Sequence, residues 1–238
     1  MKNKYALIIF LIIGIICFTI VLISFERKII RVEAASAFYP YAEEHINRLI
    51  KGESSKYARV EMVSTNEAYK DIINKKADFI VATEPSSDQK KMVEEAGINL
   101  KYKVLYLEPL AILVNSECEI DNIGIEEIQR IYFENDSNWN SYQLEKNNGS
   151  QTCFESIVKG NVIEKNHFSI VTMPDIIDRI AEDPKGIGYA FYSYYSKTHK
   201  NENAKIISVE GKNIMDKDYP LLFEVYLIYR DDSSFFIK

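Results

Sequence analysis

Three polar turns carry the residue types that could bind an anion, and each comes just before an amphipathic helical pattern. The turns are Ala35-Ser36-Ala37, Ser64-Thr65-Asn66 and the segment 147–152, which reads Asn-Asn-Gly-Ser-Gln-Thr. A helix N-terminus leaves backbone N–H groups without intrahelical partners, and Ser and Thr hydroxyls supply further donors, so such turns can bind an anion without a cationic side chain. Each turn alone is equally well an ordinary helix cap. Anion binding therefore requires that the three turns converge.

A fourth candidate contact is the pair Thr83 and Glu84, which ends a predicted apolar strand over 78–83. Ligands of α/β proteins collect at the carboxyl ends of strands, so these side chains are placed to line a cleft. The alternative is a strand terminus with a solvated carboxylate. A carboxylate repels an anion unless the ligand brings a proton to donate, as hydrogen phosphate does.

The remaining reactive side chains give weaker signals. Cys153 lies near the start of a predicted helix, where the pKa of a thiol can fall, so a thiol hydrolase is one hypothesis. His45, His167 and His199 have no spacing typical of a metal site, and no nucleotide-binding or catalytic motif occurs, so we expect neither a metal nor a cofactor. Cys118 and Cys153 could form one disulfide, but two free thiols are favoured.

Composition and charge narrow the class of protein. The chain has 238 residues, 47% of them hydrophobic and 27% charged, which is typical of one large globular domain or two small lobes. It contains 29 Lys and Arg against 35 Asp and Glu, a net charge of −6. Because nucleic-acid binding depends on neutralising phosphates with basic side chains, this balance argues against a nucleic-acid partner.

An apolar run near the N-terminus predicts a membrane anchor. The segment 5–25 holds 21 consecutive uncharged residues, rich in Ile, Leu, Phe and Val, and as a helix it would span ~30 Å, enough to cross a bilayer. A cleaved signal peptide is the alternative, but the run exceeds the usual ~7–15 apolar residues. We therefore expect residues 1–28 to tether the protein to a membrane through one helix.

The rest of the chain alternates short β-rich runs with helical patterns, which predicts an α/β fold with a mainly parallel sheet. Predicted strands cover 29–34, 58–63, 78–83, 102–107, 110–114, 188–191, 205–209 and 223–229. Predicted helices cover 39–49, 66–74, 89–96, 125–133, 150–158 and 174–181. The three polar turns therefore lie at the starts of the first, second and fifth predicted helices.

Several short strings, taken in order, resemble the phosphate-binding subunit of phosphate ABC transporters, the PstS-like family. They are Ser36-Ala37-Phe38-Tyr39-Pro40, the segments 77–86, 109–115 and 125–139, Gly149-Ser150-Gln151-Thr152, Gly186-Ile187-Gly188-Tyr189 and Tyr219-Pro220-Leu221. The resemblance extends over roughly residues 29–230. It implies a two-lobed type 2 periplasmic-binding-protein fold that closes on a ligand. Lobe 1 would comprise 29–107 completed by 211–238, and lobe 2 would comprise 108–210.

The resemblance also implies a function and a set of ligand contacts. The protein would be an extracytoplasmic, membrane-tethered solute-binding protein, not an enzyme, that captures a small oxyanion, phosphate above all, and presents it to the permease subunits of an ABC transporter. The family's phosphate contacts correspond to Ser36, Ala37, Phe38, Thr65, Thr83, Glu84, Asn148, Gly149, Ser150 and Thr152.

One departure from the family keeps a second hypothesis open. Aligned on Gly149-Ser150-Gln151-Thr152, the chain has Leu144 where the family's loop usually carries an Arg, while Lys146 could supply a point charge nearby. The alternative is a scaffold or sensor domain that keeps the fold but has lost phosphate binding.

Overall fold

The structure is a computed structural model that describes residues 29–51, 58–133, 138–158, 168–232 and 236–237. The predicted membrane helix within residues 1–28 lies outside these ranges, as does His167. Over the described ranges, no helix combines the length and the apolar character needed to cross a bilayer.

Strands and helices alternate along the chain. The strands are β1 (Ile30–Ala35), β2 (Ile50–Lys51), β3 (Ala58–Val63), β4 (Phe79–Ala82), β5 (Leu100–Asn115), β6 (Asn122–Ile123), β7 (Asn140–Leu144), β8 (Phe168–Ile170), β9 (Gly186–Phe191), β10 (Ala204–Val209), β11 (Leu222–Arg230) and β12 (Phe236–Ile237). The helices are the 3-10 turn η1 (Ser36–Phe38), α2 (Tyr39–Leu49), α3 (Thr65–Ile73), α4 (Ser87–Glu95), α5 (Ile125–Phe133), α6 (Gly149–Val158), α7 (Met173–Glu182) and α8 (Tyr192–Lys197).

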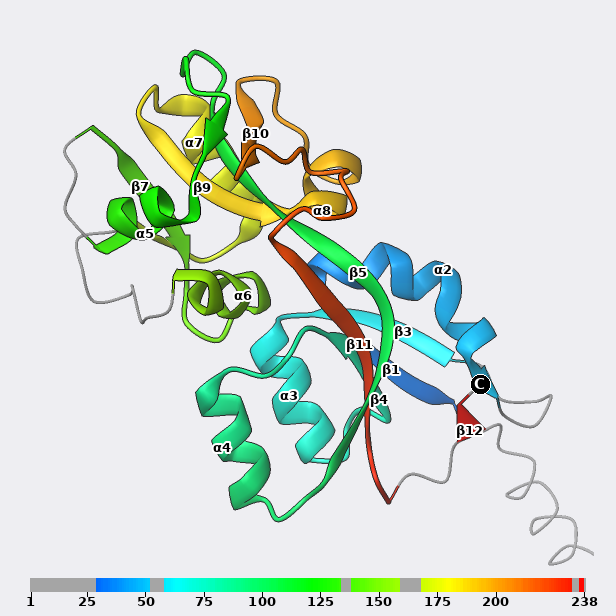
Figure 1. Ribbon diagram of the computed structural model, residues 1–238. Helices are drawn as coiled ribbons and strands as arrows, with labels where there is room; N and C mark the ends of the chain where they lie inside the picture. Colours follow the sequence, from blue (N-terminus) through cyan, green and yellow to red (C-terminus); the bar gives the residue numbers. More distant parts are fainter. Residues whose placement is uncertain (1–28, 52–57, 134–137, 159–167, 233–235, 238) are drawn as a thin grey trace, which may run out of the picture.

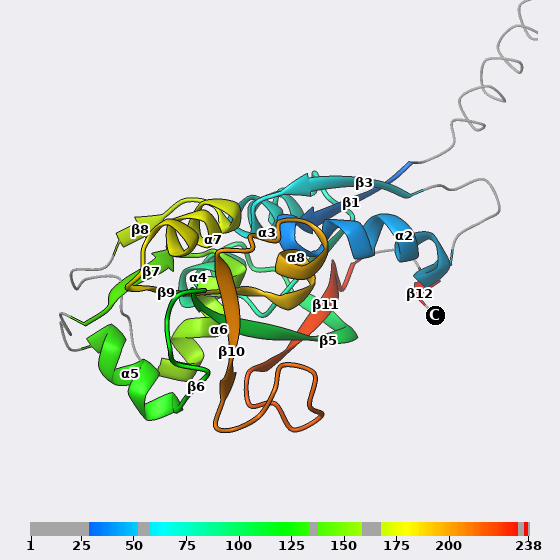
Figure 2. The ribbon, with the colours of Figure 1, turned by 90° about the horizontal axis from the view of Figure 1, so that it is seen from above.

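One sheet runs through the molecule in the order β3-β1-β4-β11-β5-β9-β7-β8, with β10 paired to both β5 and β6. Figure 1 shows two halves joined along β5 and β11. We call β1, β3 and β4 with α2, α3 and α4 the first half, and β7 to β10 with α5 to α8 the second half. A separate pair, β2 and β12, places the C-terminal strand beside the end of α2, as Figure 2 shows from above.

The sheet is mixed, so the prediction of a mainly parallel sheet was wrong. β1 pairs in parallel with β3 and β4, and β7 does so with β8 and β9. The long strands β5 and β11 are antiparallel to each of their partners. The two strands predicted over 102–107 and 110–114 are one strand, because Pro109 lies where β5 exchanges β11 for β9 and interrupts no pairing.

In the first half, helices cover both faces of the sheet. Phe79 and Val81 of β4 belong to the apolar cluster that contains the buried side of α2. Ile80 and Ala82, which point the other way, pack with Tyr69 of α3 in a second cluster. Strands buried on both faces explain the continuous apolar run of β4 in the sequence.

The segments that cross between the halves are fixed by hydrogen bonds. Leu110 donates its N–H to the Leu221 carbonyl (2.9 Å) and accepts from the Tyr219 hydroxyl (3.0 Å). Glu108, which is 1% exposed, accepts from the backbone N–H (2.7 Å) and the hydroxyl (2.8 Å) of Ser193 at the start of α8. Both crossings are therefore anchored beside the region where the halves meet.

Candidate ligand-binding site

The three polar turns converge on one cavity between the two halves, with a volume of about 500 Å³. The first half contributes η1 and the start of α3, and the second half contributes the start of α6. A fourth helix start, that of α7, joins them through Thr172. The polar residues around this cavity include Ser36, Ser64, Thr65, Asn148, Ser150 and Thr172. Ala37, Phe38 and Gly149 line it as well. We call it the smaller cavity.

The helix starts on the smaller cavity differ in how they are capped. Ser64 accepts from the Glu67 N–H (3.1 Å), and Thr172 accepts from the Asp175 N–H (3.4 Å), as expected of N-cap residues. Neither η1 nor α2 has a side-chain cap, and the Ser36 hydroxyl, which is exposed, makes no hydrogen bond with the described residues. The donor at Ser36 is therefore available to a ligand.

Most polar groups in the turn before α6 form hydrogen bonds with one another. The Asn148 side-chain oxygen accepts from both the N–H and the hydroxyl of Ser150, each at 3.0 Å. The Thr152 hydroxyl donates to the Asn148 carbonyl at 3.1 Å. The Ser150 hydroxyl would therefore have to leave Asn148 before it could donate to a ligand.

Gly149 brings the two halves into direct contact. Its N–H donates to the Thr65 hydroxyl oxygen at 3.1 Å. A Cβ at this position would lie 2.9 Å from Thr83 Oγ1 and 3.1 Å from Thr65 Oγ1, so the close approach requires glycine. Thr83 is 1% exposed, and within the described ranges its hydroxyl has no hydrogen-bond partner other than the neighbouring Cys153 thiol, which is a weak one. A buried hydroxyl without a partner costs stability, which suggests that a ligand supplies the partner.

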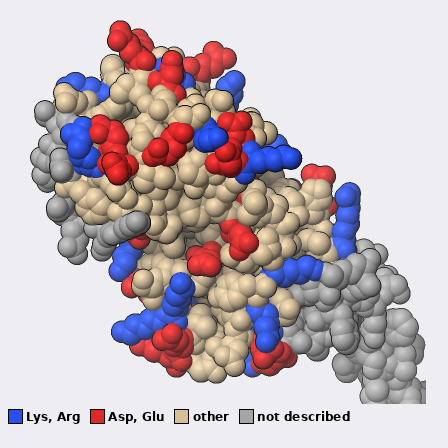
Figure 3. All heavy atoms as spheres, viewed as in Figure 1, with Lys and Arg blue, Asp and Glu red and all other residues tan. Residues whose placement is uncertain are grey.

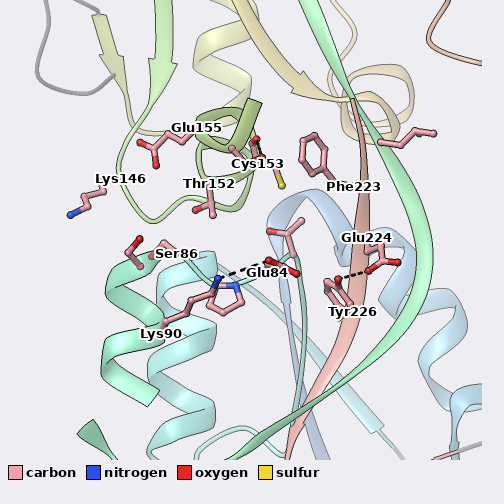
Figure 4. Close-up of a pocket in the computed structure, with 15 residues that line it drawn as sticks. Glu84, Ser86, Lys90, Lys146, Thr152, Cys153, Glu155, Phe223, Glu224 and Tyr226 are labelled. Carbon is pink, nitrogen blue, oxygen red and sulfur yellow. Dashed lines mark hydrogen bonds and ion pairs between the residues drawn. The ribbon is translucent and has the colours of Figure 1, made fainter. Parts of the chain in front are cut away.

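Three of the predicted contacts, Thr83, Glu84 and Thr152, line a second and larger cavity of about 700 Å³. Figure 4 shows α6 residues on one side of it, the β4–α4 segment on the other, and Phe223 and Tyr226 of β11 beside them. Gly149 and Thr65 of the smaller cavity lie against Thr83 of the larger one, so the two cavities are next to each other. The structure thus brings all ten predicted residues to one region but divides them between two cavities.

The charges of the larger cavity are mixed. Glu84 is exposed and lies 4.0 Å from the Lys90 ammonium, and Glu224 accepts a hydrogen bond from Tyr226 (Figure 4). Lys146 pairs with Asp88 at 2.7 Å, and hydrogen bonds from Lys146 and Asn147 lower the pKa of Asp88. On the face in Figure 3, basic and acidic side chains of the described residues are interspersed, without an extended patch of one sign.

Cys153 does not have the properties of a nucleophile. It is 6% exposed, and burial raises the pKa of its thiol to about 12, so the thiol is protonated at neutral pH. The hypothesis of a reactive thiol is therefore not supported, because desolvation is the largest cause of the shift and raises the pKa of the thiol. Cys118 and Cys153 are both free, as predicted. Within the described ranges, no three His, Cys, Asp or Glu side chains gather as they would around a metal ion.

Sequence reasoning missed a clasp between α4 and the turn before α6. Ser86 donates to the Asn147 side-chain oxygen (2.6 Å), Gln89 donates to the Asn147 carbonyl (3.0 Å), and the Asn147 amide donates to Asp88 (3.3 Å). Ser86 and Gln89 also form a capping box at the start of α4. The Ser-x-x-Gln spacing could have revealed this helix start, but nothing local indicates the partner in the other half.

A mixed sheet whose halves share two long strands, with helix starts meeting in a cleft between them, defines the architecture of solute-binding proteins. A model of the PBP (periplasmic-binding-protein) superfamily domain matches residues 24–235, and the chain belongs to this superfamily. The PstS-like resemblance predicted from sequence is confirmed. No curated protein sequence matches the chain at a significant level.

Solved structures show the same fold. A protein from Clostridium perfringens, described as a phosphate ABC transporter substrate-binding protein with bound phosphate, is similar with a TM-score of 0.70 at 14% identity, over 87% of this chain and 88% of that one. An ABC-type phosphate transport receptor from Vibrio cholerae gives 0.59 at 14%, over 86% and 88%. A sulfate-bound OxyR2 regulatory domain from Vibrio vulnificus gives 0.61 at 13%, over 87% and 89%. At these identities the likeness is one of fold.

Proposed function

We propose that this protein is a solute-binding protein that captures a small oxyanion, with phosphate as the first candidate, in the cleft between its halves. The observation that carries the proposal is the convergence of the three polar turns on the smaller cavity. Partial positive charge at helix starts and free hydroxyls can hold an anion in a protein that is itself acidic. The phosphate bound in the Clostridium perfringens protein supports this class of ligand.

The two halves would act as lobes, 29–107 with 211–238 and 108–210. The exchange of partners along β5 between Pro109 and Leu110 supports this division. Lobe closure would exclude water from the cleft, and hydrogen bonds to an anion are stronger where the dielectric constant is low. Release of the ligand would require the Gly149–Thr65 contact to open.

We further propose an extracytoplasmic location, with residues 1–28 as a membrane anchor and ABC permease subunits as partners. The uncharged run over 5–25 and the membership in the PBP superfamily support this proposal. Protease accessibility of the soluble part in intact cells, with a cytoplasmic protein as control, tests the location.

Calorimetric titration of the full chain in lipid nanodiscs with phosphate, sulfate and acetate tests the capture of an anion. We expect heat of binding for at least one oxyanion and a loss of affinity of about 10-fold or less in Ser36→Ala, because one neutral hydrogen bond is removed. Ser116→Ala, at an exposed serine that lines neither cavity, serves as the matched control. Absence of heat with every anion would refute the proposal.

A second candidate function is a sensor or scaffold domain. The likeness to the OxyR2 regulatory domain favours it, and so does Leu144, which is fully buried in the core where the family's loop usually carries an Arg. Such a domain would give no heat with anions that its relatives bind, while remaining folded and able to bind a protein partner.

A further inference from the structure

The smaller cavity offers an anion hydrogen-bond donors but no full positive charge. None of the described residues that line it is Lys or Arg, and its one carboxylate is that of Glu67. Lys146, the cation that the sequence placed nearest, lines the larger cavity and pairs with Asp88 at 2.7 Å. A site without a cationic partner favours an anion of low charge, because burying a second negative charge without compensation is costly.

The rest of the cavity wall is apolar. Phe38 and Phe191 contact each other at a ring-centroid distance of 5.0 Å. At the rim, Met62 of the first half is 61% exposed and Val171 of the second half is 64% exposed. Large apolar side chains that face one opening from both halves indicate a surface that a ligand covers. The apolar residues around the cavity include Phe38, Met62, Val171, Met173, Phe191 and Tyr194.

The volume is also too large for a bare oxyanion. The cavity measures about 500 Å³. A water molecule occupies about 30 Å³ of liquid, so a group of five heavy atoms fills a small part of this space. Cavities of about 300–1,000 Å³ are typical of sites for organic ligands.

We infer that the ligand is an organic oxyanion, in which a phosphonate, phosphate-ester or sulfonate group meets the polar turns and an apolar body packs against the wall of the cavity. The inference rests on the proposed function and specifies its ligand. Free inorganic phosphate leaves the apolar wall uncovered and binds more weakly.

Paired titrations of the full chain in nanodiscs test the ligand class. Phosphate is compared with phenylphosphonate, and sulfate with benzenesulfonate, so that each pair differs by an apolar ring. We expect the ring to raise affinity about 10- to 100-fold in each pair, as burial of an aromatic side chain does. If phosphate or sulfate binds as tightly as its phenyl derivative, the inference is overturned and the proposed function stands. If none of the four binds, the proposed function fails with it.

Two variants at the rim of the smaller cavity test where the apolar part of the ligand packs. Because Met62 and Val171 are exposed, Met62→Ser and Val171→Ser leave the fold intact and should weaken phenylphosphonate about 3- to 10-fold without changing phosphate affinity. Met215→Ser, at a side chain that is 71% exposed and does not line the cavity, is the matched control. Equal effects of the rim variants on phosphate and phenylphosphonate, or no effect on either, would overturn the inference.

Discussion

At the scale of single residues, the Thr83 hydroxyl links stability to binding. It is buried, and among the described residues only the Cys153 thiol, a weak partner, interacts with it. Thr83→Val keeps the shape and removes the unsatisfied group, so we expect the free energy of unfolding of the ligand-free protein to rise by about 1 kcal/mol and oxyanion affinity to fall about 10-fold. Urea denaturation and calorimetric titration measure the two effects.

Thr65→Val is the matched control for this experiment. The Thr65 hydroxyl accepts the Gly149 N–H, so its removal leaves that donor without its acceptor and should lower stability. A loss of stability in Thr83→Val would show that Thr83 has a partner even without ligand.

Glu33 gives a pH dependence of stability. It is 7% exposed, and desolvation, with the charges of Asp71 and Glu67, raises its pKa from 4.5 to about 7. Because the folded state holds this proton more tightly than the unfolded state, the stabilising contribution is complete below pH 4.5 and is lost as pH rises through about 7. As pH rises from 5 to 8, the free energy of unfolding of Glu33→Gln should therefore increase by about 1 to 2 kcal/mol relative to that of the natural protein.

Urea denaturation of both proteins across this range of pH measures the difference. Glu94→Gln, at an exposed side chain on α4 that does not contribute to the shift of Glu33, is the control and should follow the natural protein. Parallel pH profiles for Glu33→Gln and the natural protein would contradict the assignment to Glu33.

At the scale of elements, the clasp between α4 and the turn before α6 depends on one residue. Asn147 has a φ of 68° and makes side-chain bonds to Ser86 and Asp88. Asn147→Gly keeps the left-handed backbone accessible and loses only the side-chain bonds, for which we expect a cost of about 1 to 2 kcal/mol. Asn147→Ala also loses the side-chain bonds but keeps a Cβ in the left-handed region, so it should be about 1 kcal/mol less stable than Asn147→Gly.

Chemical denaturation of the two variants separates the side-chain and backbone contributions. If Asn147→Gly is as stable as the natural protein, the side-chain bonds of Asn147 to Ser86 and Asp88 contribute nothing to stability.

Elements with a clear local signal were predictable, and those held by tertiary contacts were not. The helices over 39–49 and 125–133 were predicted with their observed bounds, because apolar residues recur at helical spacing and Pro40 marks the start of α2. β7 was missed because its sequence, Asn-Ser-Tyr-Gln-Leu, is polar although four of its five residues are buried. Helices α6 and α7 contact β7 and bury these residues, which no local pattern shows.

At the scale of the whole molecule, the halves are held together by bonds that need no ligand. The Gly149–Thr65 bond and the Asn147 clasp both cross the cleft. We therefore expect small-angle scattering to show a compact ligand-free protein that contracts little when an oxyanion is added. The double variant Thr65→Val, Asn147→Gly should expand when free and contract on binding. A large contraction of the natural protein would show that these contacts do not persist without ligand.

The candidate site could be anticipated only in part. Its turns were identifiable from helix-start chemistry, and the family resemblance indicated that they belong together, but their convergence depends on how β5 and β11 join the halves. The charges of the site could not be predicted from the sequence either. No local sequence pattern shows that Asp88 forms an ion pair with Lys146 or that burial keeps the Cys153 thiol protonated. Partners distant in sequence decide these properties.

The position of Pro109 in β5 bears on how the halves could move. Proline has no backbone N–H, so the strand carries one fewer ladder bond at the residue where it changes from one partner to the next. Bending there breaks no hydrogen bond donated by Pro109, whereas bending at Leu110 would strain the bond from its N–H to the Leu221 carbonyl. The sheet can therefore bend most easily at Pro109. Replacing Pro109 with a residue that has a backbone N–H should make it harder for the two halves to move apart.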